Sequence, residues 1–293
     1  MTDTDSQNVV VVTGASSGIG KATAEAFAVM GWHVIGTGRD PERCEQAEAD
    51  IRAAASANAR VDFLRGDFSE MADVKRVAGE IAALTGKIDI LINNAGGVRD
   101  QRYLTSEGNE ATFAANHLAP FLLTRELLPQ IKAAAEGKPA GTVRVLATSS
   151  LAHASTPGMN WDDLQNLETE PFPATPAYCQ AKLANLLYTR ELNKRLSGDG
   201  IIAQAMSPGV VLTNFSSYGD GSMQAYLKDA PGATAEEAAR TLIWMATSPE
   251  CGVDGGRNFY ELQETTTMDN AKDDEAAARL WSETEKILAN MGY

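Results

Sequence analysis

The chain has 293 residues, 44% of them hydrophobic, which is enough for one large α/β domain or two small ones around a buried core. Its formal net charge of −14 and its lack of a basic cluster argue against nucleic acid or an anionic membrane as a partner. The N-terminus is polar and acidic, and no apolar run approaches the roughly 18 residues of a membrane span, so we expect a cytoplasmic protein. The cysteines lack disulfide or metal-ligand spacing, so we expect reduced thiols and no bound metal.

A glycine-rich segment follows the first apolar run, Val9–Thr13, which reads as a buried strand. Gly14, Gly18 and Gly20 lead from this strand into a helix that starts near Ile19. Glycines allow a tight turn and a close approach to a pyrophosphate, and the helix N-terminus offers unpaired N–H groups. The segment predicts a dinucleotide cradle, whereas an ordinary glycine-rich turn is the alternative reading.

Strand-like and helical stretches then alternate along the chain. Further strands are predicted at His33–Thr37, Val61–Leu64, Ile88–Asn93, Val143–Thr148 and Ile201–Met206. Helices are predicted to start near Glu42, Met71, Glu110, Ala177 and Ala235. This alternation predicts a doubly wound parallel α/β sheet, a Rossmann fold, in one domain over residues 1–293 with a polar tail at 1–7 and an acidic C-terminal helix at 273–291.

Two irregular segments, residues 151–175 and 213–232, follow the fifth and sixth predicted strands. Open α/β sheets bind ligands beyond the carboxyl ends of their strands, so we expect both segments to be substrate loops. An apolar, partly aromatic pocket wall is predicted from Met159, Trp161, Leu164, Phe172, Phe215, Tyr218, Met223, Tyr226 and Leu227. The alternative is that these side chains only pack the loops onto the body of the protein.

Tyr178 and Lys182 stand four residues apart, which places them on one face of a helix. A phenol is a poor base at neutral pH, but a nearby ammonium favours its ionised form. The pair therefore suggests acid–base chemistry, although a solvated surface pair would have the same spacing.

The ordered set of motifs resembles the short-chain dehydrogenase/reductase family from about Asn8 to Thr213. The resemblance rests on Thr13–Gly20, Asp67, Asn93–Gly96, Asn116, Ser149–Ser150, Tyr178, Lys182 and Pro208–Gly209. The pattern is closest to retinol-dehydrogenase-like reductases through the stretches Asn116–Thr124, Ser149–His153 and Tyr178–Asn185.

The resemblance implies a role for each catalytic residue. Tyr178 would be the general acid/base and Ser150 would donate a hydrogen bond to the substrate oxygen. Lys182 would lower the pKa of Tyr178 and hold the nicotinamide ribose, while Asn116 would anchor a water on a proton path. Ser149 competes with Ser150; we choose Ser150 because the active hydroxyl of the family precedes an apolar residue, here Leu151.

The resemblance also implies the residues that bind the cofactor. They are Gly14, Ser16, Ser17, Gly18, Ile19, Gly20, Arg39, Asp67, Phe68, Asn94, Ala95, Gly96, Tyr178, Lys182, Pro208, Gly209, Val211 and Thr213. Asp67 would contact the adenine and Thr213 the carboxamide. The alternative interpretations are purely structural: Asp67 would cap a helix, and Asn94 would be a turn residue.

The end of the second predicted strand bears on the choice of cofactor. An NAD enzyme places an acid there for the ribose 2′-hydroxyl, but this chain has Gly38 followed by Arg39, which suits a 2′-phosphate. The sequence favours NADP, with Asp40 in a shifted loop as the NAD alternative.

Taken together, the sequence predicts an NADP(H)-dependent alcohol dehydrogenase or carbonyl reductase that acts on a lipophilic or aromatic alcohol, ketone or aldehyde. Alternatives are an NAD-dependent enzyme, a reductase of an activated carbon–carbon double bond and a non-catalytic NADP-sensing protein; a homo-oligomer is compatible with all of them. We expect His33, His117 and His153 to be structural, with His153 the one that lies near enough to Ser150 to touch substrate.

Overall fold

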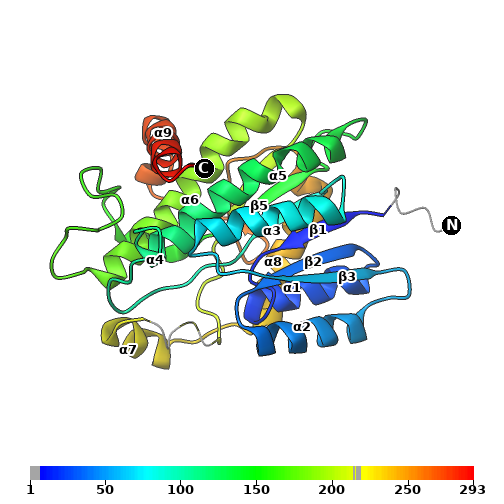
Figure 1. Cartoon of the computed structure of the whole chain (residues 1–293), viewed down its shortest axis with the longest axis horizontal. Coiled ribbons are helices and arrows are strands. Elements are labelled where there is room, and N and C mark those ends of the chain that lie inside the picture. Colours follow the sequence, from blue (N-terminus) through cyan, green and yellow to red (C-terminus); the bar gives the residue numbers. More distant parts are fainter. Residues whose placement is uncertain (1–6, 214, 216–218) are drawn as a thin grey trace.

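The computed structural model describes residues 7–213, 215 and 219–293. Eight strands form one sheet in the order β3-β2-β1-β4-β5-β6-β7-β8 (Figure 1). The strands are β1 (Val9–Val12), β2 (His33–Gly38), β3 (Arg60–Arg65), β4 (Ile90–Asn93), β5 (Arg144–Thr148), β6 (Ile202–Met206), β7 (Asn258–Tyr260) and β8 (Gln263–Glu264). Neighbouring strands are parallel except for the pair β7–β8, which is antiparallel.

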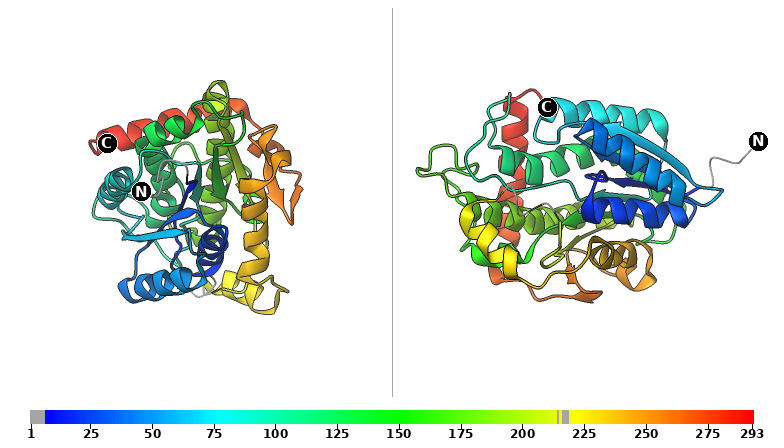
Figure 2. Two further views of the ribbon diagram at one scale, coloured as in Figure 1. Left: turned by 90° about the vertical axis from the view of Figure 1, so that its right-hand side faces the viewer. Right: turned by 90° about the horizontal axis from the view of Figure 1, so that it is seen from below.

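Helices cover both faces of the sheet (Figure 2). They are α1 (Gly18–Val29), α2 (Pro41–Ala54), α3 (Met71–Leu84), α4 (Ala111–Phe113), α5 (Ala119–Ala135), α6 (Ala174–Leu196), α7 (Gly221–Asp229), α8 (Ala235–Thr247) and α9 (Asp274–Asn290). Helices α1, α2 and α8 pack on one face, α3, α5 and α6 pack on the other, and α9 lies against the outer side of α6. The predicted doubly wound Rossmann fold is confirmed.

The first strand explains why the central strands are apolar throughout. Val9 and Val11 face the core beneath α3, α5 and α6, whereas Val10 and Val12 face the core beneath α1 and α8. Successive side chains of a strand point to opposite faces, so a strand covered by helices on both sides needs apolar residues at every position.

The helix predicted to start near Glu110 is interrupted. Glu110 caps α4, and a π-helical turn, Ala114–Leu118, joins α4 to α5. Pro120 has no N–H to give to the carbonyl four residues earlier, which is that of Asn116, so the regular hydrogen-bond ladder cannot form at this point. The turn carries Asn116, one of the predicted catalytic residues.

The remaining differences lie at the edges of the molecule. Helix α7 lies inside the predicted loop 213–232, and the strands β7 and β8 were not predicted. The predicted C-terminal helix is α9, and Asp273 caps it by accepting hydrogen bonds from two backbone N–H groups.

At the N-terminal end of the chain, Gln7 donates hydrogen bonds to the carbonyls of Gly31 and Asn58, while residues 1–6 of the predicted tail lie outside the described residues. Among the described residues, no helix has both the length and the apolar character needed to cross a membrane.

Candidate active site

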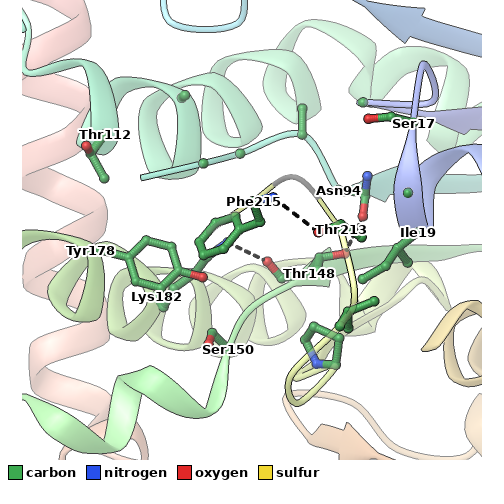
Figure 3. Close-up of a pocket in the computed structure, with 18 of the residues that line it drawn as sticks. Ser17, Ile19, Asn94, Thr112, Thr148, Ser150, Tyr178, Lys182, Thr213 and Phe215 are labelled. Carbon is green, nitrogen blue, oxygen red and sulfur yellow. Dashed lines mark hydrogen bonds between the residues drawn. The ribbon is translucent and has the colours of Figure 1, made fainter. Parts of the chain in front are cut away.

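A cleft of about 810 Å³ opens at the carboxyl ends of the central strands. Its volume falls in the range of small-molecule and cofactor sites. All the predicted cofactor residues line it except Gly20, and all the predicted catalytic residues line it except Asn116. In Figure 3, Ser17, Ile19 and Asn94 lie at one end of the view and Tyr178 and Thr112 at the other. The linear motifs are therefore brought together in one site.

The glycine-rich turn between β1 and α1 forms one end of the cleft. Gly14 and Gly18 have φ values of +69° and +52°, a region that favours glycine. A Cβ on Gly20 would lie 2.4 Å from the Gly14 carbonyl oxygen, so Gly20 packs the turn from behind. The Ser17 side chain makes no cap hydrogen bond, and the first N–H groups of a helix lack partners within the helix. This arrangement fits the pyrophosphate of a dinucleotide.

Asn94 joins the ends of three strands beneath this turn. Its Nδ2 donates to the Thr13 carbonyl at 2.9 Å, and its backbone N–H donates to Thr13 Oγ1 at 2.9 Å. Thr148 at the end of β5 donates through Oγ1 to Asn94 Oδ1 at 3.2 Å. Asn94 thus bridges the ends of these strands and fixes the floor of the cleft.

Tyr178 and Lys182 project from α6 into the cleft, as their spacing predicts. Lys182 Nζ donates to the Thr148 carbonyl at 3.0 Å and lies 5.6 Å from the centre of the Tyr178 ring. Burial lowers the pKa of Lys182 to about 7 and raises the pKa of Tyr178 above its usual value. The hydrogen bond with Ser150 opposes the effect of burial on Tyr178, but burial is the larger effect, so the phenol is protonated at neutral pH. The lowering of the Tyr178 pKa by Lys182 stays a prediction.

The two candidate serines differ in their surroundings. Ser149 is buried, and its Oγ donates to the Lys182 carbonyl at 2.9 Å, which ties β5 to α6. Ser150 Oγ accepts from the Ala152 N–H at 3.1 Å and also forms a hydrogen bond with Tyr178 that lowers the pKa of the phenol. The Ser150 hydroxyl therefore accepts from the backbone and directs its own proton at the Tyr178 oxygen, on the side of the cleft.

Asn116 lies behind the cleft. Its Nδ2 donates to the carbonyls of Gly97 and Thr112, both at 2.7 Å. Its Oδ1 is buried without a hydrogen-bond partner among the described residues, and a Cβ on Gly96 would lie 2.4 Å from Oδ1 and 3.5 Å from Lys182 Nζ. A buried carbonyl-type oxygen near an ammonium is a suitable anchor for a water, which fits the role implied for Asn116.

At the adenosine end, Gly38 is tightly packed. A Cβ there would meet Cys44 Sγ at 2.7 Å and Ser16 Cβ at 2.8 Å, so no acidic side chain fits without rearrangement. Arg39 lies on the rim, 48% exposed, with its Nη1 3.3 Å from the Asp67 carboxylate. Asp40 caps α2 by accepting from the Arg43 N–H at 2.9 Å. The carboxylate of Asp40, the alternative ligand for the ribose of NAD, is therefore already engaged in this helix cap.

The substrate end differs from the prediction. Met159, Trp161, Leu164 and Phe172 do not line the cleft. Met159 and Leu164 pack in the core, while Trp161 lies against Arg279 and Phe172 against Arg102. For these four residues the packing alternative is correct, because long-range contacts direct them onto the body of the protein.

The second predicted loop does contribute to the wall, through Phe215, Met223 and Leu227. The Phe215 ring lies 5.3 Å from the Tyr178 ring, centre to centre. Tyr218 and the side chain of Tyr226 lie outside the described part of the structure. The described apolar wall of the cleft is therefore formed by Phe215 and helix α7, together with Leu151 and Ala152 at the start of the first predicted loop, and not by residues 159–172.

Each histidine bonds to the protein. His33 contacts Asp62 at 2.7 Å, His117 contacts Thr284 at 2.7 Å, and His153 Nδ1 contacts the Ser150 carbonyl at 2.6 Å. Burial lowers the pKa of all three. His153 is not among the residues that line the cleft, so the structure gives no support to a direct substrate contact. Cys44, Cys179 and Cys251 are free and buried.

Thr148 was not singled out from the sequence. Its carbonyl accepts from Lys182 Nζ and its hydroxyl donates to Asn94, so one residue connects α6 to the floor of the cleft. The available signal was its position as the last residue of the fifth predicted strand, because the carboxyl ends of parallel strands line such sites.

Comparison with known proteins defines the class. Residues 8–159 match the family model described as short chain dehydrogenase. Human retinol dehydrogenase 13 is 37% identical over 290 residues, covering 95% of this chain and 84% of that protein, and mouse polyprenol dehydrogenase is 33% identical, covering 97% and 84%. The chain therefore belongs to the short-chain dehydrogenase family of oxidoreductases and is similar to its retinol dehydrogenases, as its motifs indicate.

Solved structures agree on the fold. A putative uncharacterized protein from Mycobacterium paratuberculosis is 31% identical with a TM-score of 0.75, covering 96% of this chain and 93% of that one. A complex of Pseudomonas aeruginosa RhlG with NADP has a TM-score of 0.67 at 24% identity, covering 86% and 94%. At that identity the second likeness concerns the fold alone.

Proposed function

We propose that this protein is an NADP(H)-dependent alcohol dehydrogenase or carbonyl reductase for a lipophilic or aromatic substrate. The observation that carries the proposal is the meeting of Tyr178, Ser150 and Lys182 in one cleft with the glycine cradle. A buried, protonated phenol beside a hydroxyl donor is the arrangement needed to protonate the oxygen of a carbonyl as it is reduced.

Each residue has a separate task in this proposal. Ser150 holds the substrate oxygen by its O–H, and Tyr178 transfers its proton to that oxygen. Lys182 supplies positive charge beside the phenol, and Asn116 Oδ1 anchors a water through which the proton is replaced. The nicotinamide, when bound, supplies the hydride. In alcohol oxidation Tyr178 takes the proton instead.

Tyr178→Phe tests the chemistry. We expect turnover to fall by roughly 10²–10⁴-fold while cofactor binding and the fold persist, because only the transferable proton is removed. Tyr188→Phe is the matched control, since Tyr188 is a buried tyrosine on the same helix that does not line the cleft. NADPH oxidation with apolar ketones and aldehydes gives the rate, and product analysis separates carbonyl reduction from reduction of a carbon–carbon double bond. Full activity of Tyr178→Phe would refute the assignment.

Three observations support NADP over NAD. No acid fits at Gly38, the Asp40 carboxylate already caps α2, and Arg39 stands on the rim in an exposed ion pair. Exposed pairs of this kind contribute only about 0–1 kcal/mol, whereas a charge-assisted bond to phosphate contributes about 1.5–3 kcal/mol. A 2′-phosphate can therefore draw Arg39 away from Asp67.

Arg39→Asp should shift cofactor preference toward NAD, because it removes this bond and adds repulsion of the phosphate. The measurement is kcat/KM with NADPH and with NADH. Arg52→Asp on α2 makes the same change of charge outside the cleft and should leave the ratio unaltered. A wild-type preference for NAD would make Asp40 the better candidate for the ribose.

An apolar substrate is supported by Phe215, Met223 and Leu227 on the wall near Tyr178. It is also consistent with relatives named for retinol and polyprenol.

A further inference from the structure

We propose that His153 is a positioning residue that fixes the catalytic hydroxyl of Ser150. The inference rests on the proposed role of Ser150. It concerns a side chain that does not line the cleft and therefore acts only through its neighbour.

His153 holds the Ser150 carbonyl with two donors. Its backbone N–H lies 3.2 Å from that oxygen and its ring Nδ1 lies 2.6 Å from it. A carbonyl can only accept, so Nδ1 carries the proton and the tautomer is fixed. The side chain is 2% exposed, and such burial makes the ring hydrogen bond stable against competition from water.

The surroundings show why Ser150 needs this support. Ser150 is the last extended residue before the short 3₁₀ turn Leu151–Ser155, where the chain leaves β5. Ser149 anchors the chain before it through the Lys182 carbonyl, and the turn itself packs against α6. The His153 ring anchors the chain after it. Ser150 is thus held on both sides, and its hydroxyl is kept facing Tyr178.

If His153 positions Ser150, activity requires a hydrogen-bond donor at the position of His153 Nδ1. The amide nitrogen of asparagine can occupy the place of Nδ1, whereas that of glutamine reaches the place of Nε2. We expect His153→Leu and His153→Gln to lower kcat by roughly 10- to 100-fold, because a displacement of about 1 Å at a reacting group has costs of this size. His153→Asn should recover most of the activity, and the Kd for NADPH should stay near the wild-type value in all three.

A second arm separates positioning from general stability. In a Ser150→Ala background, His153→Leu should cause no further loss of kcat, because the hydroxyl that it positions is absent. Melting temperatures of all variants show which of them fold. If His153→Leu folds poorly, the comparison of the two polar variants still decides the question.

The outcomes distinguish the two proposals. Equal activity of the asparagine and glutamine variants, or losses that multiply in the double variant, would overturn the role of His153. Full activity of Ser150→Ala alone would instead refute the catalytic role of Ser150. An inactive Ser150→Ala together with an unaffected His153→Leu would refute only the inference about His153.

Discussion

At the residue scale, the protonation of the site is governed by burial. Tyr178 and Lys182 are 6% and 5% exposed, and the low polarity around them favours the neutral form of each group. For Tyr178 this keeps the proton that the proposed carbonyl reduction would consume. For Lys182 it brings the pKa to about 7, so the charge beside the phenol changes within the physiological range.

The buried lysine predicts a pH dependence of stability. Its folded pKa of about 7 lies below the usual lysine value of 10.5, so between these values the unfolded chain binds more protons and the free energy of unfolding rises with pH. Lys182→Met removes this dependence. From pH 7 to pH 9, the stability of wild type relative to Lys182→Met should therefore increase by about 2 kcal/mol.

Urea unfolding at several pH values measures this difference. Lys194→Met removes an exposed lysine from the same helix and should give a pH profile parallel to that of wild type. Parallel profiles for wild type and Lys182→Met would contradict the lowered pKa of Lys182.

At the scale of elements, the sequence predicts those strands and turns that are determined by a local sequence pattern. The strands β1 to β6 are marked by short apolar runs, and the glycine turn by residues that need a positive φ. Strand β8 is two exposed polar residues, Gln263 and Glu264, whose pairing with β7 has no local signal. The π-helical turn depends on Pro120, whose effect falls on a carbonyl four residues earlier. Such features arise from contacts between segments or from backbone geometry.

In the candidate site, too, residues marked by a local pattern lie in the cleft as predicted, and residues placed by distant contacts do not. Tyr178, Lys182 and Ser150 follow from spacing and from the family resemblance, and they meet in the cleft. Trp161 and Phe172 were misassigned because the cations that cover them, Arg279 and Arg102, lie far away in the sequence. An aromatic residue in a loop carries no mark that tells whether it faces a ligand or an arginine.

Helix α7 is connected to α6, the helix that carries Tyr178 and Lys182. Thr175 in the first turn of α6 donates through Oγ1 to Asp220 Oδ2 at 2.9 Å, and Asp220 Oδ1 accepts from the Met223 N–H at 2.9 Å. One carboxylate thus caps α7 and bonds to the helix of Tyr178. This arrangement sets the position of the apolar wall relative to the phenol.

Phe215→Ala tests the wall. Removing a ring 5.3 Å from that of Tyr178 should raise KM for apolar ketones or change their ranking, while the Kd for NADPH stays nearly unchanged. A panel of ketones of graded size provides the measurement. Phe172→Ala is the control, because Phe172 belongs to the other loop and does not line the cleft. A wild-type ranking in Phe215→Ala would remove the main support for a lipophilic substrate.

At the scale of the whole molecule, α9 reaches the catalytic region. Thr284 Oγ1 donates to the Leu280 carbonyl and therefore accepts from His117 Nε2, at 2.7 Å. His117 is the residue after Asn116 in the π-helical turn, and burial lowers its pKa to about 3, so it bonds as a neutral ring. Phe121, Tyr188 and Trp281 surround this contact with stacked and tilted rings.

Thr284→Val should destabilise the protein by about 1–3 kcal/mol, because it leaves the buried N–H of His117 without an acceptor. Thr284→Ser keeps the hydroxyl and should retain most of the stability. Ser282→Ala removes an exposed hydroxyl from the same helix and serves as the control. Urea unfolding gives the comparison, and an unchanged midpoint and slope for Thr284→Val would show that the bond contributes nothing.

The bond between His117 and Thr284 joins residues 167 positions apart, and this has a consequence for the protein as it is made on the ribosome. The glycine cradle and β1, β2 and β4 are complete within the first hundred residues. The turn of Asn116 gains its contact with α9 only after the last helix has emerged, roughly 8–33 s later at ordinary rates of translation. The glycine-rich end of the cleft can thus take shape early, while the proposed proton path is among the last parts to be secured.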